Sequence, residues 1–442
     1  MESDSSNRSR FQQDASQPSN AGSGQSLGVI DRMARRIVVR QLRDLTRGEI
    51  TLRDASGTCR VGQADDLHVV MQIHKPRFYR DAMLGGTLSV AESYLQGDWD
   101  CDDLAGLFRI FTRNCESADR FDKGFARLTG MVHRWFHHWH ANSRSGSRKN
   151  IHAHYDLGNE FFRLWLDDTM AYSSAIFTGQ DDSLQQASTE KFDRVCRRLQ
   201  LKSSDHVLEI GSGWGGFAMH AASQYGCRVT TTTISQEQYD EARQRIREAG
   251  LSHRISVLLS DYRDLKGQFD KLVSIEMIEA VGHKYMDEYF RCCSQLLKPT
   301  GSMVLQAILM PERRHEQYLK SVDFIQRYVF PGGCLPSMGA ILDSVARATD
   351  LRLVNAEDFA PHYAETLRRW CAAFHERIDD VRQLGYSERF LRLWHYYLCY
   401  CEAVFEERYC GVMQIQFDKP RCRRDAIPAS STGRETMFAD RM

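Results

Sequence analysis

Apolar residues recur at helical spacing in some parts of the chain and form short, strand-like runs in others. The changes between these two patterns mark the boundaries of its segments. Residues 1–27 are polar and low in complexity, which predicts a disordered tail. From Val29 to Leu42, apolar residues recur at helical spacing and arginines fill much of the rest, which predicts a basic amphipathic helix. Short apolar runs at 50–52, 59–61 and 69–73 predict a hairpin and a third strand, and helices are predicted at 91–95 and 104–111 around a turn at 97–100. Residues 28–130 are therefore predicted to form a small α+β domain.

Two interpretations fit the basic helix. Its arginine-rich face suits anionic lipid headgroups, which would make residues 28–130 a domain that docks on a membrane surface. The same pattern also fits an ordinary helix whose charged face is solvated.

Residues 131–150 are predicted to form an amphipathic helix and a linker. Six of the sixteen histidines lie at 131–154, among Trp, Phe and Arg. No carboxylate or cysteine is interleaved at ligand spacing, so no metal site is predicted. The aromatic and cationic residues suit a membrane interface, and a plain inter-domain helix is equally consistent with them.

After the linker, strands and helices alternate. Helices are predicted at 184–199, 236–249, 284–297, 364–378 and 388–407, and strands at 207–210, 227–234, 255–259, 269–275, 302–308, 352–354 and 412–417. Lys298-Pro299-Thr300-Gly301 is a helix stop. Such alternation predicts an α/β domain at 151–419, with a parallel sheet covered by helices on both faces, and residues 420–442 are predicted to be a flexible tail.

Composition and charge limit the partners and the compartment that the protein can have. Lys and Arg (58) balance Asp and Glu (58), which gives no global case for nucleic acid as a partner. The thirteen cysteines show no paired C-x-x-C spacing, and no secretory signal is recognisable, so reduced thiols in the cytoplasm are predicted. No apolar run reaches membrane-spanning length, which leaves peripheral association with a membrane.

A glycine-rich stretch at 207–217 follows the first strand of the α/β domain and runs directly into a helix. Its spacing is E-x-G-x-G-x-G-G, beginning at Glu209, which differs from both the P-loop and the dinucleotide fingerprint. Backbone N–H groups and a helix N-terminus at the carboxyl end of a parallel strand form a ligand site. The spacing resembles the first motif of S-adenosylmethionine-dependent methyltransferases. In such a site Gly211, Ser212 and Gly213 would line the methionine part of the cofactor, and Glu209 is also predicted to bind the cofactor.

Two further strand ends would complete this cofactor site. The second strand ends in Thr233-Ile234, where many nucleotide folds place an acid for the ribose, and Gln238 follows one turn later. Asp261 and Tyr262 follow the third strand, where an acid can hold the adenine amine.

Ordered matches extend this resemblance over most of the sequence. Residues 148–419 resemble cyclopropane-fatty-acyl-phospholipid synthases, including the mycolic acid cyclopropane synthases, and 83–107 resemble the N-terminal domain of the phospholipid-acting members. The matching stretches are 154–162, 170–175, 207–217, 233–235, 261–264, 279–282 and 328–337. The resemblance implies a class I S-adenosylmethionine methyltransferase with a Rossmann-like, seven-stranded sheet, and it adds Tyr172 and Ser173 to the cofactor-binding residues.

The implied reaction requires an acyl double bond to attack the sulfonium methyl, which leaves a carbocation. An apolar pocket with aromatic faces suits that cation, and a base must remove a proton from the new methyl before a ring can close. In the family a bound bicarbonate is the base, held by a Cys, a Glu, a His, an Ile backbone group and a Tyr. Carried over by motif, three of these ligands are Glu279, Ile308 and Tyr363.

Two ligand positions depart from the family pattern. Ser174 stands at the Cys position and Gln306 at the His position, and both can still donate hydrogen bonds to an anion. If proton removal is slow, a hydride shift leaves a methyl branch or a methylene instead of a ring.

Cys401 aligns with a cysteine once considered as a nucleophile in the family. The chemistry needs no thiolate, so a buried helix residue is the favoured interpretation of Cys401.

The sequence thus predicts methylene transfer to cis double bonds of membrane phospholipid acyl chains, giving cyclopropane fatty acids, at the cytoplasmic face of the membrane and with a homodimer as one compatible state. The alternatives are a C-methyltransferase that leaves a methyl branch or a methylene on the fatty acid, a small-molecule N-methyltransferase and a non-catalytic lipid-binding relative.

Overall fold

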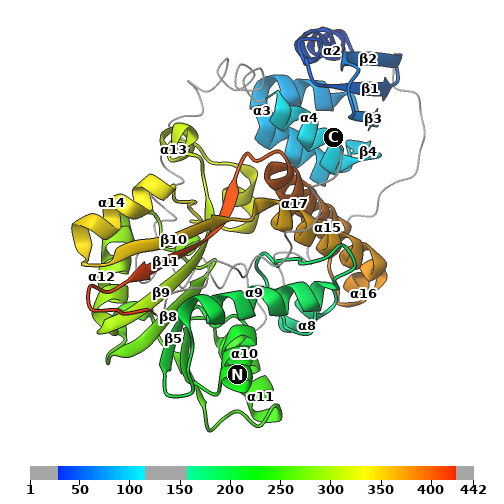
Figure 1. Ribbon diagram of the computed structural model, residues 1–442. Helices are drawn as coiled ribbons and strands as arrows, with labels where there is room; N and C mark the ends of the chain where they lie inside the picture. The colour runs from blue at the N-terminus through cyan, green and yellow to red at the C-terminus, as the bar shows by residue number, and fades with distance from the viewer. Residues whose placement is uncertain (1–27, 115–156, 425–442) are drawn as a thin grey trace, which may run out of the picture.

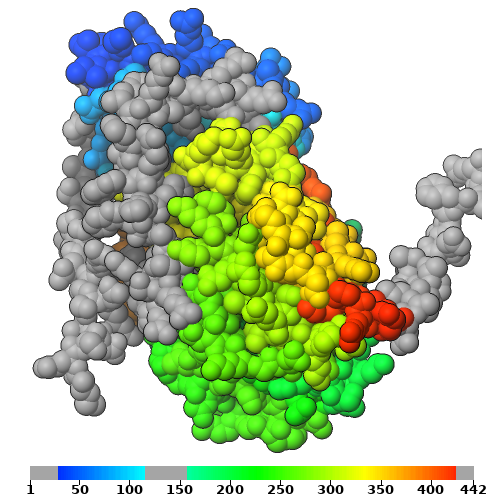
Figure 2. All heavy atoms as spheres, turned by 90° about the vertical axis from the view of Figure 1, so that its left-hand side faces the viewer, coloured from blue at the N-terminus to red at the C-terminus, as the bar shows by residue number. Residues whose placement is uncertain are grey.

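The computed structural model describes residues 28–114 and 157–424, and all structural statements concern these two ranges. The protein forms a small N-terminal unit at one end of a larger α/β unit (Figures 1 and 2). Three segments lie outside the described residues, namely the predicted tail at 1–27, the histidine-rich stretch at 131–154 and residues 425–442.

The N-terminal unit has a four-stranded sheet in the order β2-β1-β3-β4. Its elements are α2 (Val29–Leu42), β1 (Gly48–Asp54), β2 (Gly57–Gln63), β3 (His68–Ile73), α3 (Arg77–Leu95), β4 (Trp99–Cys101) and α4 (Leu104–Arg113). The predicted hairpin is confirmed, because β1 and β2 pair antiparallel across a turn in which Gly57 has φ +110°. The predicted turn at 97–100 is wrong in its second half, since Trp99 already pairs with Ile73.

The larger unit contains a seven-stranded sheet in the order β10-β11-β9-β8-β5-β6-β7, which confirms the predicted class I fold. The strands are β5 (His206–Ile210), β6 (Arg228–Thr233), β7 (Ile255–Leu259), β8 (Phe269–Ile275), β9 (Leu297–Leu309), β10 (Arg352–Asp358) and β11 (Gly411–Asp418). Six of them run in the same direction, and β11 runs antiparallel to its two neighbours, β9 and β10. The order reverses at β5, so that the glycine-rich turn after it opens into the crevice where such sheets bind ligands.

Helices cover both faces of the sheet because its central strands are apolar on both sides. On one face α9 (Leu184–Leu199), α10 (Gly216–Tyr225) and α11 (Gln236–Glu248) pack on Val207 and Val229. On the other face α12 (Met286–Leu296) and α14 (Met338–Ala348) pack on Leu208, Leu272 and Leu305. The remaining helices are α8 (Asn159–Arg163), α13 (Glu312–Tyr318), α15 (Ala360–Glu376), α16 (Ile378–Gln383) and α17 (Glu388–Glu406).

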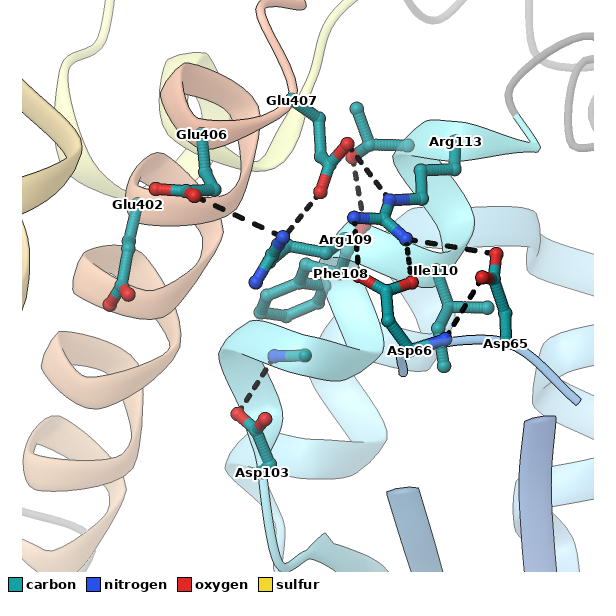
Figure 3. A network of polar contacts seen from close by, with 12 residues as sticks. Asp65, Asp66, Asp103, Phe108, Arg109, Ile110, Arg113, Glu402, Glu406 and Glu407 are labelled. Carbon is teal, nitrogen blue, oxygen red and sulfur yellow. Dashed lines mark hydrogen bonds and ion pairs between the residues drawn. The ribbon is translucent and has the colours of Figure 1, made fainter. Parts of the chain in front are cut away.

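The two units share one apolar core, in which α17 packs against α3 and α4. An ion-pair network at their junction adds to this packing, because Glu407 accepts from Arg109 at 2.7 Å and from Arg113 at 2.9 Å (Figure 3). Arg392 of α17 also donates to the backbone carbonyls of Tyr94 and Trp99. The N-terminal unit is therefore docked on α17.

Several further boundaries differ from the predictions. The predicted strand at 302–308 is β9, which begins at Leu297, the predicted strand at 352–354 extends to Asp358, and the predicted helix at 364–378 begins at Ala360. Residues 420–424 lie within the described range, and the guanidinium of Arg424 binds Asp418, so this part of the predicted flexible tail at 420–442 is held against the sheet. The predicted helix at 91–95 is the end of α3, which begins at Arg77. Among the described residues, no helix is both long and apolar enough to cross a membrane.

Candidate active site

A cavity of about 610 Å³ opens beside the carboxyl ends of β5, β6 and β8. All eleven residues predicted to bind the cofactor line it, namely Tyr172, Ser173, Glu209, Gly211, Ser212, Gly213, Thr233, Ile234, Gln238, Asp261 and Tyr262. Four of the six predicted catalytic residues also line it, namely Glu279, Ile308, Tyr363 and Cys401. The fold thus gathers residues from distant parts of the sequence into one site.

The glycine-rich turn has the backbone conformation that its sequence predicts. Gly211 has φ +96° and Gly215 has φ +87°, values that side chains disfavour, and α10 begins at Gly216. A Cβ atom on Gly211 would lie 3.1 Å from the Met277 side chain, and one on Gly216 would lie 2.6 Å from the Thr169 carbonyl. The turn therefore brings bare backbone to the cavity wall.

Replacing Gly211 with Ala should weaken S-adenosylmethionine binding by about tenfold or more, because the methyl group adds about 1–2 kcal/mol of backbone strain at this φ and crowds Met277. Isothermal titration calorimetry measures the change. Gly250→Ala is the matched control, since Gly250 has φ +71° and open space around it, outside the cavity lining. Equal weakening in both variants would contradict a specific role for the turn.

Side chains at the next two strand ends are held in fixed orientations. The Thr233 hydroxyl donates to Oε1 of Gln238 at 2.9 Å. Asp261 accepts from Nε of Arg263 at 2.8 Å and from its Nη2 at 2.6 Å. A carboxylate fixed in this way at the cavity wall suits an adenine or ribose partner.

Glu276, at the end of β8, is the centre of the polar contacts on the opposite side of the cavity. Its Oε1 accepts from the backbone N–H of Ser174 at 2.9 Å and from Nε2 of Gln306 at 2.7 Å, and its Oε2 accepts from the Tyr363 hydroxyl at 2.9 Å. Burial raises the pKa of Glu276, while the charge of Lys191 and these three donors oppose the rise. Glu276 lines the cavity and has φ +46°, an uncommon conformation for this residue type.

Sequence reasoning missed Glu276 as a site residue, because beside Glu279 it looks like an exposed helical pair. The signal that identifies it is its position directly after a buried parallel strand, where open α/β sheets place functional groups.

Lys191 was also missed, and it supplies the positive charge of this region. Its ammonium group is fully buried and donates to the Ser173 hydroxyl at 2.6 Å. Burial lowers the pKa of Lys191 to about 8, while the carboxylates of Glu276, Asp167 and Glu209 oppose that shift. Lys191 lies on the buried stripe of α9, one turn from Ala187 and Val195. A lysine on an apolar stripe is the sequence signal that could have identified it.

Glu279 lies next to Glu276 and is held through one oxygen. Its Oε1 accepts from the backbone N–H of Ile308 at 2.6 Å, whereas its Oε2 is buried without a hydrogen-bond partner among the described residues. Burial, and next the charge of Glu276, raise the pKa of Glu279 to about 8. The carboxyl is therefore largely protonated at neutral pH.

This pKa implies a stability effect with a defined sign. The folded protein keeps the Glu279 proton from its ordinary value of 4.5 up to about pH 8, whereas the unfolded protein loses it at the lower value. The stabilisation is complete below that window and is lost as pH rises through it, by up to about 1.4 kcal/mol per pH unit. Glu279→Gln should remove this part of the pH dependence. Urea unfolding of the ligand-free protein at pH 5, 6, 7 and 8 measures it; Glu248→Gln on the surface of α11 should keep the wild-type slope, and an unchanged slope in Glu279→Gln would contradict the shift.

Ser174 and Gln306 lie behind Glu276 rather than in the cavity wall. The Ser174 hydroxyl donates to the Ala175 carbonyl at 3.1 Å, and Oε1 of Gln306 accepts from Gln414 at 3.1 Å. Three groups already donate hydrogen bonds to the Glu276 carboxylate: the backbone N–H of Ser174, the side-chain amide of Gln306 and the hydroxyl of Tyr363. The residues predicted to hold bicarbonate therefore do not fit that anion in this protein, because the carboxylate of Glu276 occupies the donors that bicarbonate would need.

Aromatic rings form the apolar wall of the cavity. The hydroxyls of Tyr172 and Tyr397 are 2.8 Å apart, and Phe405 stacks on Tyr363 with ring centroids 4.3 Å apart. Cys401 also lines the cavity, and burial raises the pKa of its thiol well above the usual value, so it is neutral. Rings of this kind stabilise a cation, and a neutral thiol leaves Cys401 without nucleophilic character.

The profile of the mycolic acid cyclopropane synthetase family matches residues 142–415. The protein belongs to this family. It is 39% identical over 384 residues to the tuberculostearic acid methyltransferase of Mycobacterium tuberculosis (strain ATCC 25618 / H37Rv), covering 84% of this sequence and 88% of that protein. It is 36% identical over 355 residues to the cyclopropane-fatty-acyl-phospholipid synthase of Escherichia coli (strain K12), covering 79% and 87%.

Solved structures agree with this membership. The cyclopropane synthase MmaA2 from Mycobacterium tuberculosis has a TM-score of 0.58 and 29% identity, covering 62% of this sequence and 98% of its own. The mycolic acid cyclopropane synthase CmaA1 complexed with SAH and CTAB has a TM-score of 0.58 and 31% identity, with the same coverage. This protein is thus an S-adenosylmethionine-dependent methyltransferase that adds one carbon to lipid acyl chains, as a methyl group or as the third carbon of a cyclopropane ring.

Proposed function

We propose that this enzyme methylates cis double bonds in the acyl chains of membrane phospholipid, and that Glu276 accepts the proton released from the new methyl group. The observation that carries the proposal is the set of donors on Glu276. The family resemblance implies that the positions of Ser174, Gln306 and Tyr363 bind bicarbonate. In this protein these three residues donate hydrogen bonds to the Glu276 carboxylate instead. A residue of the protein thereby takes the place of a diffusible base.

The protein's own residues would divide the work as follows. Bound S-adenosylmethionine supplies an electrophilic methyl group. The rings of Tyr172, Tyr397 and Tyr363 exclude water and face the positive charge that develops on the lipid. Lys191 and the three donors oppose the rise in the pKa of Glu276 that burial causes, which favours the carboxylate form that can take up a proton.

The product that this arrangement favours is a methylene-branched fatty acid. The same donors make the Glu276 carboxylate a weaker base than an unpaired buried carboxylate, so proton removal is slowed. The cation then has time for a hydride shift onto the neighbouring carbon, after which loss of a proton from the methyl group leaves a C=CH₂ branch. A saturated branch would need a separate reductase. The name of the tuberculostearic acid methyltransferase, 39% identical, agrees with a methylated product.

Cyclopropane formation is the second candidate, and the 36% identical synthase from Escherichia coli favours it. Here Glu276 removes the proton before any hydride shift, and the ring closes. Both products gain one CH₂ over the substrate, so mass alone does not separate them.

Product analysis with a labelled donor tests the proposal. The full-length protein is incubated with vesicles of an unsaturated phospholipid and S-adenosylmethionine carrying a trideuterated methyl group, and the fatty-acid methyl esters are analysed by mass spectrometry before and after mild hydrogenation. We expect loss of one deuteron and uptake of hydrogen by the product. A product that resists hydrogenation would favour the ring, and retention of the whole label would contradict proton removal at this site.

The membrane is proposed to meet the N-terminal unit. Val29, Ile30 and Met33 on α2 are 66–75% exposed, and Leu84 of α3 is 53% exposed. Arg35 of the same helix as Val29 instead binds Asp54, so the basic face is partly used within the fold. Activity should therefore depend on vesicles, which a soluble amine acceptor would not require.

Localisation at the inner face of the membrane and a homodimer remain predictions. Light scattering of the purified protein tests the dimer.

A further inference from the structure

A second cluster of reactive side chains lies on the side of α15 and α17 that points away from the cavity. His395 and Cys399 are one helical turn apart on α17. Tyr397 and Cys401, two positions on from each, line the cavity, so the first pair faces the other way. Cys371 lies on the facing side of α15, which packs closely against α17.

The distances within this cluster are close to those of a tetrahedral metal site. The two sulfurs of Cys371 and Cys399 are 4.0 Å apart, and one ligand atom each of Cys371, His395 and Cys399 lie within 4.8 Å of one another. Around zinc, with bonds of about 2.3 Å to sulfur and about 2.0 Å to nitrogen, neighbouring ligand atoms are about 3.5–3.8 Å apart. A small movement of the three side chains toward one another would bring their ligand atoms to the distances found around zinc.

An outer contact orients the histidine of the cluster. The Tyr94 hydroxyl lies 3.0 Å from Nδ1 of His395, which leaves Nε2 as the nitrogen available to a ligand. Histidines that bind metals commonly make such a second hydrogen bond, which fixes the ring and its tautomer. Tyr94 belongs to α3, so the contact reaches from the N-terminal unit to α17.

The ligand types also suit a cation. A bound metal ion takes cysteine as the thiolate and histidine as the neutral imidazole, and it displaces the thiol protons as it binds.

We propose that Cys371, His395 and Cys399 bind a zinc ion at the junction of α15, α17 and the N-terminal unit. Two thiolates and an imidazole are ligands that zinc prefers, and a water molecule would take the fourth position. The ion would be structural, because it lies outside the cavity and joins two helices of the α/β unit where Tyr94 of the N-terminal unit contacts them. Spacing within the sequence does not predict it, since its ligands come from two helices.

Metal content of the full-length protein tests the site. The protein is reduced, stripped with a chelator, mixed with ZnCl₂, desalted and analysed by mass spectrometry for metals. We expect about one zinc per molecule for the wild type and less than about one tenth in Cys371→Ser/Cys399→Ser. The control Cys59→Ser/Cys292→Ser also removes two of the thirteen cysteines, both outside the cluster, and should keep the zinc.

Cobalt provides a spectroscopic readout that does not depend on activity. Co²⁺ should give a thiolate charge-transfer band in the wild type, and the His395→Gln variant, which leaves both cysteines in place if the double variant fails to fold, should weaken or abolish that band. Tyr94→Phe should weaken Co²⁺ binding by about tenfold, since it removes the outer hydrogen bond. Zinc retained by Cys371→Ser/Cys399→Ser, or no zinc taken up by the reduced wild type, would overturn the proposal.

Discussion

Replacing Glu276 with Gln should lower the rate of lipid product formation by about 10²–10⁴-fold, the range typical of losing a positioned general base. The amide keeps the size of the side chain but does not accept a proton from the transferred methyl. The loss should appear in kcat with saturating S-adenosylmethionine, measured as methyl-ester product from phospholipid vesicles.

Two measurements separate this loss from misfolding. S-adenosylmethionine binding by calorimetry should stay within about threefold of the wild type, because the glycine-rich turn is untouched. Glu248→Gln, the same exchange on the exposed side of α11, should retain full activity. A Glu276→Gln enzyme within tenfold of the wild-type rate would show that another group accepts the proton.

Replacing Lys191 with Met should reduce the free energy of unfolding by about 3–5 kcal/mol, because the change leaves buried carboxylates without their cation and the Ser173 hydroxyl without its donor. It should also raise the pKa of Glu276 further, so that residual activity recovers only at higher pH. Urea unfolding and a pH–rate profile measure the two effects.

Lys202→Met is the matched control, since Lys202 is exposed just after α9. It should change stability by less than about 0.5 kcal/mol. A Lys191→Met variant as stable as this control would mean that the buried ammonium does not compensate the carboxylates around it.

The sheet and the cofactor side of the site could be predicted because local patterns specify them. Strand periodicity placed β7 and β8 with their observed bounds, and the glycines at 211–216 marked the crevice. All of the predicted cofactor residues line one cavity, since the carboxyl ends of parallel strands meet there.

The acid–base side of the site was harder to predict, because its chemistry depends on burial and on partners distant in sequence. Ser174 and Gln306 were correctly singled out as departures from the family pattern, yet the group that they bind, Glu276, was not. The charge that most opposes the rise in the pKa of Glu276 belongs to Lys191, which lies 85 positions earlier on another element. A single sequence does not show that two such charges share one buried site.

The central claim is that Glu276 does the work of a bound bicarbonate, and an assay in carbonate-free buffer tests it most directly. Product formation by the wild type is measured under nitrogen in degassed buffer, with and without added bicarbonate, beside the Glu276→Gln variant. We predict that the wild-type rate is the same in both buffers. A wild-type rate that falls without bicarbonate and returns when it is added would contradict the account.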